Sequence, residues 1–413
     1  METRERAGKL SLQGRDAPLP LADLATPSLW FLAILCLLMG FGSISTDLYL
    51  PAMPAMGLAL RAKPGAIELT VSAYLLGFSL GQLAWGPVSD RYGRRTPIAL
   101  GLMLFILGSA ACALSTSAVL LIVGRVVQAL GACASVVLAR AMVRDLYSGS
   151  RAARMLSTLM MVMAIAPLLG PIVGGQILLI GSWRAIFWTL VGVGVATLGA
   201  LFTLPETLPD HKRNRQPFAR ALTSYFSVLG NRRLAAYIGA GGFFYGGLFA
   251  YVAGSPFAYI NFYHLSPQRY GVVFAAGAGG IMATNLVNAR LVTRLSSDKL
   301  LRIGTGAAAV AAIATAIDAY SGWGGFTGLA LPVFLFTSMT GFVVANSIVG
   351  ALQDFPERAG AISALIGATQ YGSGVMGSAL VGVFADGTPW SMGWVIALSG
   401  VGSALSAWLL KSP

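Results

Sequence analysis

The stretch Leu29–Pro54 reads LWFLAILCLLMGFGSISTDLYLPAMP, and the interpretation of the whole chain starts from it. Its first seventeen residues, Leu29–Ser45, carry no charge, and about 20 apolar residues are long enough to cross a bilayer as a helix. Asp47 follows, before Pro51 and Pro54 interrupt the helix. A carboxylate at membrane depth costs about 2.5–3.5 kcal/mol on insertion scales, so such a residue usually faces a cavity or a partner. We therefore interpret Asp47 as a proton site in a cavity.

The composition of the chain indicates a membrane protein. Of its 413 residues 56% are hydrophobic and only 10% are charged, whereas soluble domains average about 25% charged residues. The 51 glycines fit membrane helices, in which glycine lets backbones approach closely. Apolar runs of about 20 residues favour helices over the short alternating strands of a barrel. The sequence thus predicts an all-α polytopic membrane protein.

Twelve spans can be placed along the chain, and each is interpreted as an α-helix because lipid cannot satisfy a free backbone. The expected ranges are 29–54, 67–88, 97–115, 118–140, 155–179, 186–204, 234–259, 270–289, 300–318, 326–349, 360–384 and 391–410. A polar, basic segment divides them into two sets of six. The predicted domains are a cytoplasmic tail (1–27), an N-terminal six-helix bundle (28–204), a cytoplasmic linker (205–233) and a C-terminal six-helix bundle (234–413), around a central cavity.

The net charge of +13 is explained by topology and needs no nucleic-acid partner. If the N-terminus is inside, 23 of the 28 Lys and Arg residues fall in cytoplasmic segments. The outside loops hold four of them, Arg61, Lys63, Arg184 and Arg269, and Arg125 lies within a span. This asymmetry is the positive-inside bias, and it predicts that both termini are cytoplasmic.

No residues form a pattern typical of an enzyme. Cys36, Cys112 and Cys133 all fall in apolar spans without metal spacing, and we interpret them as small buried hydrophobic residues. His211 and His264 lie in predicted loops. A Walker loop is absent, which argues against ATP as the energy source. We expect no enzymatic activity, no metal and no cofactor, with a proton gradient as the energy source.

Arg125 is the second charge expected inside the membrane. It lies seven residues from Ala118, at the outer end of its span, and Asp47 lies seven residues from Pro54. At 1.5 Å per residue both sit about 10 Å below the outer surface, so we expect the two side chains to be neighbours. Because an arginine stays protonated, it can hold Asp47 ionised until a proton or cargo intervenes. A permanent ion pair between the two spans is the alternative.

Several polar and aromatic side chains within apolar runs are candidates for the cavity wall. Phe244, Leu248 and Tyr251 share one helical face, although aromatic residues at this spacing also serve ordinary packing. Glu68 and Asp318 lie at outer span ends, and we interpret them as solvent-accessible boundary charges. The predicted substrate-binding residues are Tyr74, Gln128, Phe244, Tyr251, Asn346 and Gln370.

Two further motifs point to conformational change. In the loop Gly86–Arg95, GPVSDRYGRR, Asp90 can pair with Arg94 or cap a helix across the interface between the halves. We interpret this loop as a latch, and an ordinary solvated charge run is the alternative. The fifth span reads MVMAIAPLLGPIVGGQ. Its prolines should bend the helix and seal one side of a pore, whereas close packing alone is the alternative.

These motifs together resemble the major facilitator superfamily. The run APLLGPIVGG is similar to the antiporter motif of its drug:proton members. With TDLYLPAMP, VRDLYSG and LPETLP, the chain resembles the Bcr/CflA family of bicyclomycin and chloramphenicol-type exporters, especially its bicyclomycin-resistance branch. The residues that match family motifs are Asp47 and Arg125 for proton coupling, Gly86, Asp90, Arg91, Gly93, Arg94 and Arg95 for the latch, and Pro167, Gly170, Pro171, Gly174 and Gly175 for the antiporter motif.

The resemblance implies proton-driven efflux of small antibiotics from the cytoplasm by alternating access. It implies a multi-pass protein of the bacterial inner membrane whose partners are drugs, protons and lipid, and for which a monomer suffices. Some related antiporters have a second carboxylate where this chain has Met39, which favours neutral or zwitterionic cargo here. Glu68 stands where close relatives have an amide. The alternative function is a proton-coupled or facilitative transporter of a small metabolite, such as an amino acid.

Overall fold

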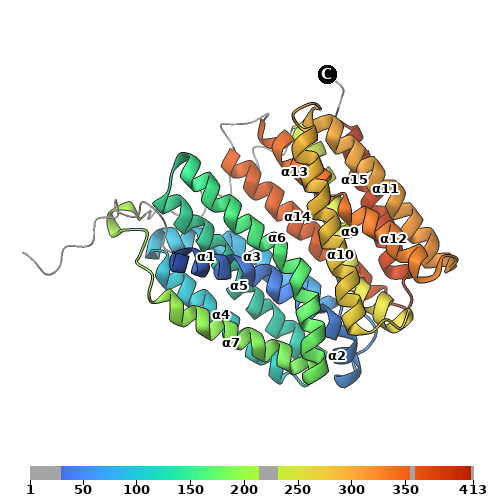
Figure 1. Cartoon of the computed structure of the whole chain (residues 1–413), viewed down its shortest axis with the longest axis horizontal. Coiled ribbons are helices and arrows are strands. Elements are labelled where there is room, and N and C mark those ends of the chain that lie inside the picture. Colours follow the sequence, from blue (N-terminus) through green and yellow to red (C-terminus); the bar gives the residue numbers. More distant parts are fainter. Residues whose placement is uncertain (1–28, 214–230, 354–358, 411–413) are drawn as a thin grey trace, which may run out of the picture.

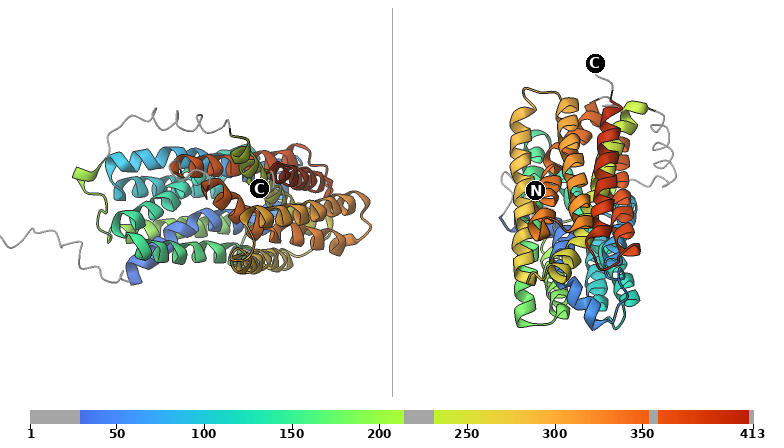
Figure 2. Two further views of the ribbon diagram at one scale, coloured as in Figure 1. Left: turned by 90° about the horizontal axis from the view of Figure 1, so that it is seen from above. Right: turned by 90° about the vertical axis from the view of Figure 1, so that its right-hand side faces the viewer.

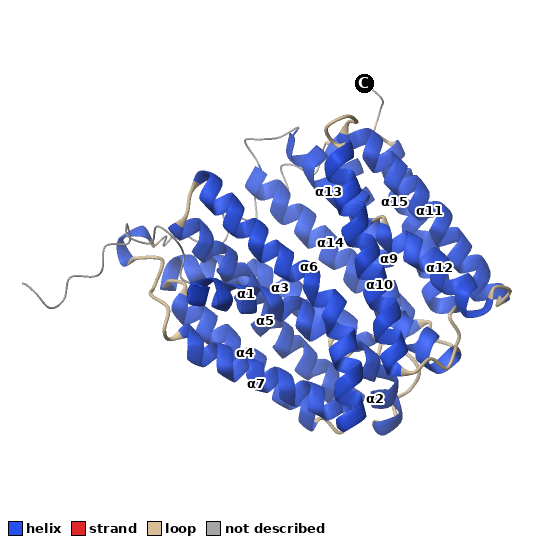
Figure 3. Ribbon diagram, in the orientation of Figure 1, coloured by secondary structure: helices blue, strands red, loops and turns tan. Residues whose placement is uncertain are grey.

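The computed structural model describes residues 29–213, 231–353 and 359–410. Every regular element within these ranges is a helix (Figure 3). The predicted tail (1–27) and the middle of the predicted linker (214–230) lie outside the described residues. The helices fall into two groups, and three views show the blue-to-green helices on one side and the yellow-to-red helices on the other (Figures 1 and 2).

The first group of helices follows the first half of the chain. It consists of α1 (Leu29–Asp47), η2 (Leu50–Ala52), α2 (Met53–Ala59), α3 (Leu69–Tyr92), α4 (Arg95–Leu114), α5 (Ala118–Leu146), α6 (Gly149–Ile180) and α7 (Trp183–Leu201), with the short η3 (Asp210–Lys212) after it. We call α1–α7 the N-half. Each of the six spans expected from the sequence in this part of the chain overlaps with one of the long helices.

The second group, α9–α15, is the C-half. It consists of α9 (Arg232–Pro256), η4 (Phe257–Phe262), α10 (Pro267–Leu291), α11 (Ser297–Ser321), α12 (Gly325–Ser338), α13 (Thr340–Gln353), α14 (Ala359–Val383) and α15 (Trp390–Trp408). Here too every expected span contains a helix, and the twelve-helix architecture is confirmed.

Two spans are not the single helices that the sequence predicts. The first ends at Asp47, because the chain then turns into the short η2 and α2, each of which has a proline in its first turn. The span expected at 326–349 breaks at Met339 into α12 and α13. Around this break, Thr337 and Ser338 donate their hydroxyls to Phe334 O.

Ten of the helical segments in the described ranges are long and apolar enough to cross a membrane by length and composition. The two long helices outside this set, α3 and α14, pack against each other across the two halves. Both helices carry polar residues, which lower their apolar content. A helix covered by protein needs fewer apolar side chains than one facing lipid, which agrees with the packing of α3 against α14. Ser72 of α3 and Ser378 of α14, both buried, are hydrogen-bonded at 2.8 Å.

The two halves are in close contact at one end of the bundle. We call this end the α2 end, because it contains the connection from Leu48 to Glu68, which includes α2. We call the opposite end, which contains the turn at Gly93, the loop end. At the α2 end, Gln268 of α10 donates to Gly175 O of α6 at 2.9 Å. A Cβ at Gly271 would lie only 2.7 Å from Pro171 O, so the two backbones touch. Towards the loop end α6 and α10 diverge (Figure 1), and most of α6 from Gly149 to Met161 is exposed or half-buried.

Candidate functional site

A cavity of about 200 Å³ lies between the halves, on the loop-end side of the α6–α10 contact. Ligand pockets are mostly apolar, with a few polar groups. Six helices supply its wall, namely α1, α3 and α6 of the N-half and α9, α10 and α14 of the C-half, with Thr337 of α12 in addition. Asp47 is the one carboxylate among the described lining residues. The site is therefore an apolar chamber with a single acidic group.

Asp47 is held at the last residue of α1 by close packing against α6. A Cβ at Gly170 would lie 2.8 Å from the Asp47 Cβ, and one at Gly174 would clash with the Leu48 carbonyl oxygen. Glycine at both positions lets the two backbones approach. The Asp47 side chain is 7% exposed, and it lines the cavity next to Thr46 and Pro167. The glycines of the predicted antiporter motif thus position the acidic group.

Arg125 lies behind the cavity wall, fully buried, with its guanidinium between two aromatic rings. Its Cζ is 4.1 Å from the Tyr49 ring centroid and 4.2 Å from that of Tyr74. We call Tyr49 and Tyr74 the aromatic clamp. Nη1 of Arg125 donates to Ser45 O at 2.9 Å and to Gln128 Oε1 at 2.6 Å. A desolvated cation–π contact contributes about 2 kcal/mol, so the clamp supports a buried charge that would otherwise be costly.

The structure argues against the alternative expectation, a permanent ion pair between Asp47 and Arg125. Among the described residues, no carboxylate oxygen lies within 4.0 Å of an Arg125 nitrogen. The predicted equal depth of Asp47 and Arg125 is compatible with the structure, because Arg125 donates a hydrogen bond to the backbone oxygen of Ser45, two residues before Asp47. The aromatic clamp holds the guanidinium between the Tyr49 and Tyr74 rings, while Asp47 lines the cavity. Nε and Nη2 of Arg125 have no hydrogen-bond partner in this arrangement.

A charge-conserving substitution should show whether the aromatic clamp matters. Arg125→Lys keeps a positive charge but loses the planar group that stacks on both rings. We expect transport to fall by about tenfold and the melting temperature to drop by several degrees, since about 1–2 kcal/mol of cation–π and hydrogen-bond energy is lost. The matched control is Arg184→Lys, because Arg184 stacks on Trp183 at 4.2 Å away from the cavity lining. Equal effects of the two substitutions would contradict a special role of the clamp.

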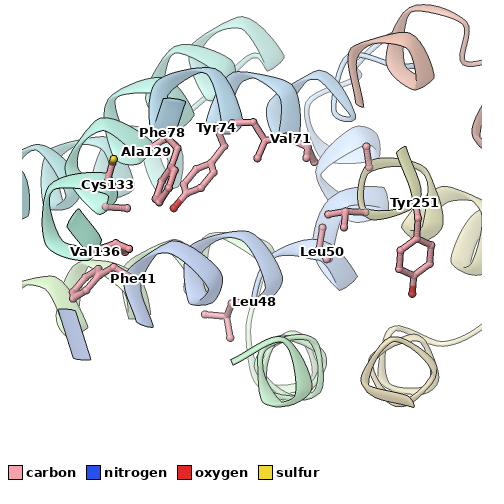
Figure 4. Close-up of a cluster of buried hydrophobic side chains, with 14 of the residues drawn as sticks. Phe41, Leu48, Leu50, Val71, Tyr74, Phe78, Ala129, Cys133, Val136 and Tyr251 are labelled. Atoms are coloured by element: carbon pink, nitrogen blue, oxygen red, sulfur yellow. The ribbon is translucent and has the colours of Figure 1, made fainter. Parts of the chain in front are cut away.

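The structure places two of the six predicted substrate residues on the cavity wall. These are Tyr74 of α3, which donates to Gly42 O at 3.2 Å, and Tyr251 of α9, which stacks on Phe274 at 5.4 Å. Figure 4 shows Tyr74 and Phe78 projecting from α3 towards α1, with Tyr251 on α9 beyond them. Tyr74 therefore belongs both to the cavity wall and to the aromatic clamp.

The other four predicted substrate residues lie outside the lining of this cavity. Gln128 is fully buried, where its amide donates to Ser109 Oγ at 2.8 Å. Phe244 is covered by Phe336 of α12, with ring centroids 4.9 Å apart. Asn346 bonds the Asn288 side chain at 2.7 Å. Gln370 is buried, with no partner for its Nε2. In each case a neighbouring helix covers the side chain, which helical periodicity alone cannot reveal.

Several aromatic residues of the wall were not among the predicted substrate residues. Phe78 of α3 and Tyr371 of α14 meet across the cavity with ring centroids 5.2 Å apart. Phe249 of α9 and Phe274 of α10 complete the aromatic surface. The available signal was weak, because these residues sit in apolar runs in which aromatic packing is the ordinary expectation. Tyr371 next to Gln370 was the best clue, since it placed a polar pair in the middle of a span.

The loop-end motif forms a compact ionic cluster within the N-half. Nη1 of Arg94 donates to Asp90 Oδ1 at 2.7 Å, and Nε of Arg94 donates to Asp145 Oδ2 at 2.7 Å. Glu206 accepts from the backbone N–H groups of Arg94 and Arg95 at 2.8 and 3.0 Å. A carboxylate at the N-terminus of α4 also interacts favourably with the helix dipole. The sequence did not single out Asp145 and Glu206, although both lie in the quoted motifs VRDLYSG and LPETLP.

The remaining motif residues differ in their surroundings. Gly93 has φ of +89° and begins the turn into α4, a conformation that favours glycine. A Cβ at Gly86 would meet nothing within 4 Å, so packing does not require a glycine there. Arg91 lies over the Tyr92 ring at 5.7 Å. Asp90 pairs with Arg94, which was one of the two expectations.

Removing the Arg94 side chain should destabilise the N-half. Burial opposes its charge, but hydrogen bonds to Asp145 and Asp90 outweigh that cost and raise the pKa of Arg94 above its ordinary value. Arg94→Ala would leave the Asp145 carboxylate, only 15% exposed, without its cation. We expect a loss of about 3 kcal/mol, seen as a lower melting temperature in detergent. The expected loop is helical up to Tyr92, so Arg91 lies in the last turn of α3. Arg91→Ala, at this exposed site, should leave the melting temperature within about 1 °C of wild type.

Two acidic residues that the sequence placed in solvent are buried. Glu68 is 5% exposed and Asp318 is 8% exposed. Asp318 accepts from the Gly324 N–H at 2.7 Å, so it fastens the turn between α11 and α12. Oε2 of Glu68 has no hydrogen-bond partner. Both residues lie at span ends, as the sequence predicts, but the expectation that solvent reaches them was wrong.

Among the described residues, no three His, Cys, Asp or Glu side chains are grouped so that they could hold a metal ion. The three cysteines are present as free thiols, and Cys112 and Cys133 are fully buried.

Comparisons with known proteins agree with this architecture. Residues 30–378 match the family model described as Major Facilitator Superfamily. The chain is 35% identical over 347 residues to the uncharacterized MFS-type transporter YdgK of Bacillus subtilis, which covers 83% of this chain and 86% of that protein. It is 30% identical to the bicyclomycin resistance protein homolog of Haemophilus influenzae, over 86% of this chain and 89% of that protein. The crystal structure of the nucleoside transporter NupG has the same fold, with a TM-score of 0.76 at 15% identity, covering 92% of this chain and 99% of NupG.

Proposed function

This chain belongs to the major facilitator superfamily, and from that premise we propose that it exports small antibiotics, bicyclomycin- or phenicol-like, in exchange for protons. The observation that carries the proposal is the position of Asp47. It is the one carboxylate among the described residues that line the central cavity, and an ionisable group inside a membrane protein usually belongs to a transport path. The similarity to a bicyclomycin resistance protein homolog supports the choice of cargo.

The charge distribution supports an orientation of the chain in the membrane. The loop end holds Arg91, Arg94 and Arg95, and the positive-inside bias assigns this end to the cytoplasm. The α2 end then faces the outside. From the contact at the α2 end and the divergence of α6 and α10 towards the loop end, we infer that the structure corresponds to an inward-facing state. We propose that the protein lies in the inner membrane of a bacterium with both termini in the cytoplasm, and that it acts as a monomer.

The cycle uses competition between a proton and cargo for one cavity. In the outward-facing state Asp47 takes a proton from the outside medium, and its neutral form favours closure of the α2 end. In the inward-facing state the proton leaves to the cytoplasm as cargo enters, and the loaded protein then turns outward. Exchange requires that each ligand weaken the binding of the other, and linkage makes this effect reciprocal.

Arg125 contributes a fixed positive charge to this cycle. Its guanidinium is anchored to Ser45 O and the aromatic clamp, so it attracts the ionised Asp47 side chain without forming an ion pair in the inward-facing state. The two donors of Arg125 that lack partners are available to a carboxylate that swings away from the cavity. Cargo that displaces Asp47 from the cavity would favour that swing.

The test is proton release triggered by drug in proteoliposomes that contain the purified full-length protein. Bicyclomycin and chloramphenicol are added as separate trial cargoes, and a pH-sensitive dye reports proton movement. We expect a drug-dependent pH change that empty liposomes lack. No response to either drug, combined with proton movement on adding amino acids, would overturn the proposal in favour of a metabolite transporter.

A further inference from the structure

A second chamber lies between the halves at the α2 end, separate from the central cavity. Its volume is about 240 Å³, and both halves supply its walls. The N-half supplies the turn from Pro54 to Glu68, and the C-half supplies α9, η4, α14 and α15. The chamber contains one carboxylate among its described lining residues, that of Glu68. The function proposed above gives this group no role.

Glu68 is buried, and one of its two carboxylate oxygens lacks the partner that a buried charge requires. Its side chain is 5% exposed and its Oε2 has no hydrogen-bond partner. No ion pair within 4.0 Å involves Glu68 in the described part of the chain. An ionised carboxylate in such a place is unfavourable by several kcal/mol, and the usual outcome is that the group takes up a proton. The closed α2 end therefore suits the neutral acid.

The charged groups near the chamber do not change this conclusion. Lys63 also lines it, but its side chain is exposed to solvent. Asp386, next to the lining residues Ala385 and Gly387, is exposed and accepts from the Thr388 N–H at 2.9 Å. From α9, η4, α14 and α15 the lining residues carry no titratable side chain; they are Gly254, Phe257, Asn261, Val381, Ser391 and Met392.

The burial of Glu68 depends on contact between the halves. Its chamber is closed on the far side by the C-half, where the Gly65 backbone packs against the Gly382 carbonyl oxygen. When the halves separate at the α2 end, that wall moves away and water reaches Glu68. The open end then favours the ionised carboxylate, and the closed end favours the neutral acid. Closure at this end thus takes up a proton.

We propose that the α2-end chamber is a second proton-binding site, in which Glu68 takes a proton from the outside medium as the halves close over it. The proposal deepens the proposed proton exchange and rests on it for the separation of the halves at the α2 end. Acid outside should favour the closed α2 end even when Asp47 cannot titrate. In each transport cycle Glu68 then takes up one proton and releases it, in addition to the proton that Asp47 takes up and releases.

The experiment measures the closure of the α2 end directly, without cargo or a gradient. Ala59→Cys on α2 and Val383→Cys on α14, both exposed, carry spin labels in the full chain with its three native cysteines replaced by alanine. Pulsed electron–electron distances in liposomes at pH 5 to 9 give the ratio of closed to open molecules. All variants are compared in the Asp47→Asn background, so that Asp47 makes no contribution.

We expect the closed-to-open ratio to rise by up to about tenfold per unit fall in pH, as linkage of one proton requires. Glu68→Gln mimics the neutral acid and should stay closed at every pH. Glu68→Asp should restore the pH dependence, and Asp386→Asn, which removes an exposed carboxylate at the same end, should leave it unchanged. A ratio independent of pH with Glu68 intact, or an unchanged pH dependence in Glu68→Gln, would overturn the proposal.

The distance measurement and the assay of drug-triggered proton release together distinguish this proposal from the proposed function. In one outcome, drug-triggered proton release is absent while the distance between the spin labels still depends on pH through Glu68. The chamber then binds a proton, but the chain is not a drug antiporter. The reverse result, with drug-triggered proton release intact and Glu68→Gln still dependent on pH, would refute the second site alone. The closed distance at pH 5 confirms in every variant that the protein is folded.

Discussion

Asp47→Asn is expected to abolish drug-triggered proton release, with a fall of about tenfold or more to the background of empty liposomes. Asparagine has nearly the same shape as aspartate but cannot take or release a proton near neutral pH. Asp47 is the one carboxylate among the described lining residues of the central cavity, so no other group on that wall can replace it. Drug binding should persist, because the cavity keeps its volume and its aromatic wall.

The measurement compares proton release and drug binding in the same preparations. Binding of bicyclomycin and chloramphenicol is followed by calorimetry in detergent, and proton release by a pH-sensitive dye in proteoliposomes. The matched control is Asp386→Asn, since Asp386 is exposed and lies away from the cavity. If Asp47→Asn releases protons as wild type does, the coupling site lies elsewhere and the central claim of the proposed function is wrong.

Gly174→Ala is expected to reduce transport by about tenfold and to lower the melting temperature by several degrees. The added methyl group would clash with the Leu48 carbonyl oxygen, a backbone atom that cannot rotate away. Overpacking of this kind costs about 1–3 kcal/mol. Leu48 follows Asp47 directly, so any shift of α1 that relieves the clash also moves the carboxylate from its place on the cavity wall.

The control for this prediction is a glycine of the same half that has open space around it. A Cβ at Gly192 of α7 would meet nothing within 4 Å. Gly192→Ala should keep wild-type transport and an equal or slightly higher melting temperature, because alanine is the better helix former. Drug efflux from cells and thermal unfolding in detergent give the two readouts. Comparable losses in both variants would show that the close packing of α1 and α6 is not what positions Asp47.

The positions of the twelve spans could be predicted from the sequence to within a few residues at most ends. A long apolar run forms a helix in lipid, because a helix satisfies the hydrogen bonding of every backbone group within its own segment. The sequence also indicated Asp47 and Arg125, since a charge in such a run is unusual enough to stand out. The break at Met339 was missed because hydroxyl side chains are common within apolar spans and rarely interrupt them.

The sequence by itself therefore determined the helical membrane fold, the charge asymmetry and the presence of a buried acid and a buried arginine. Only the tertiary structure decided which side each residue faces. It turned Phe244 and Asn346 towards neighbouring helices, placed the Arg125 guanidinium between Tyr49 and Tyr74 and closed the C-half over Glu68. The physical reason is that a membrane helix is apolar on all sides, so its periodicity does not identify the face that looks into the protein.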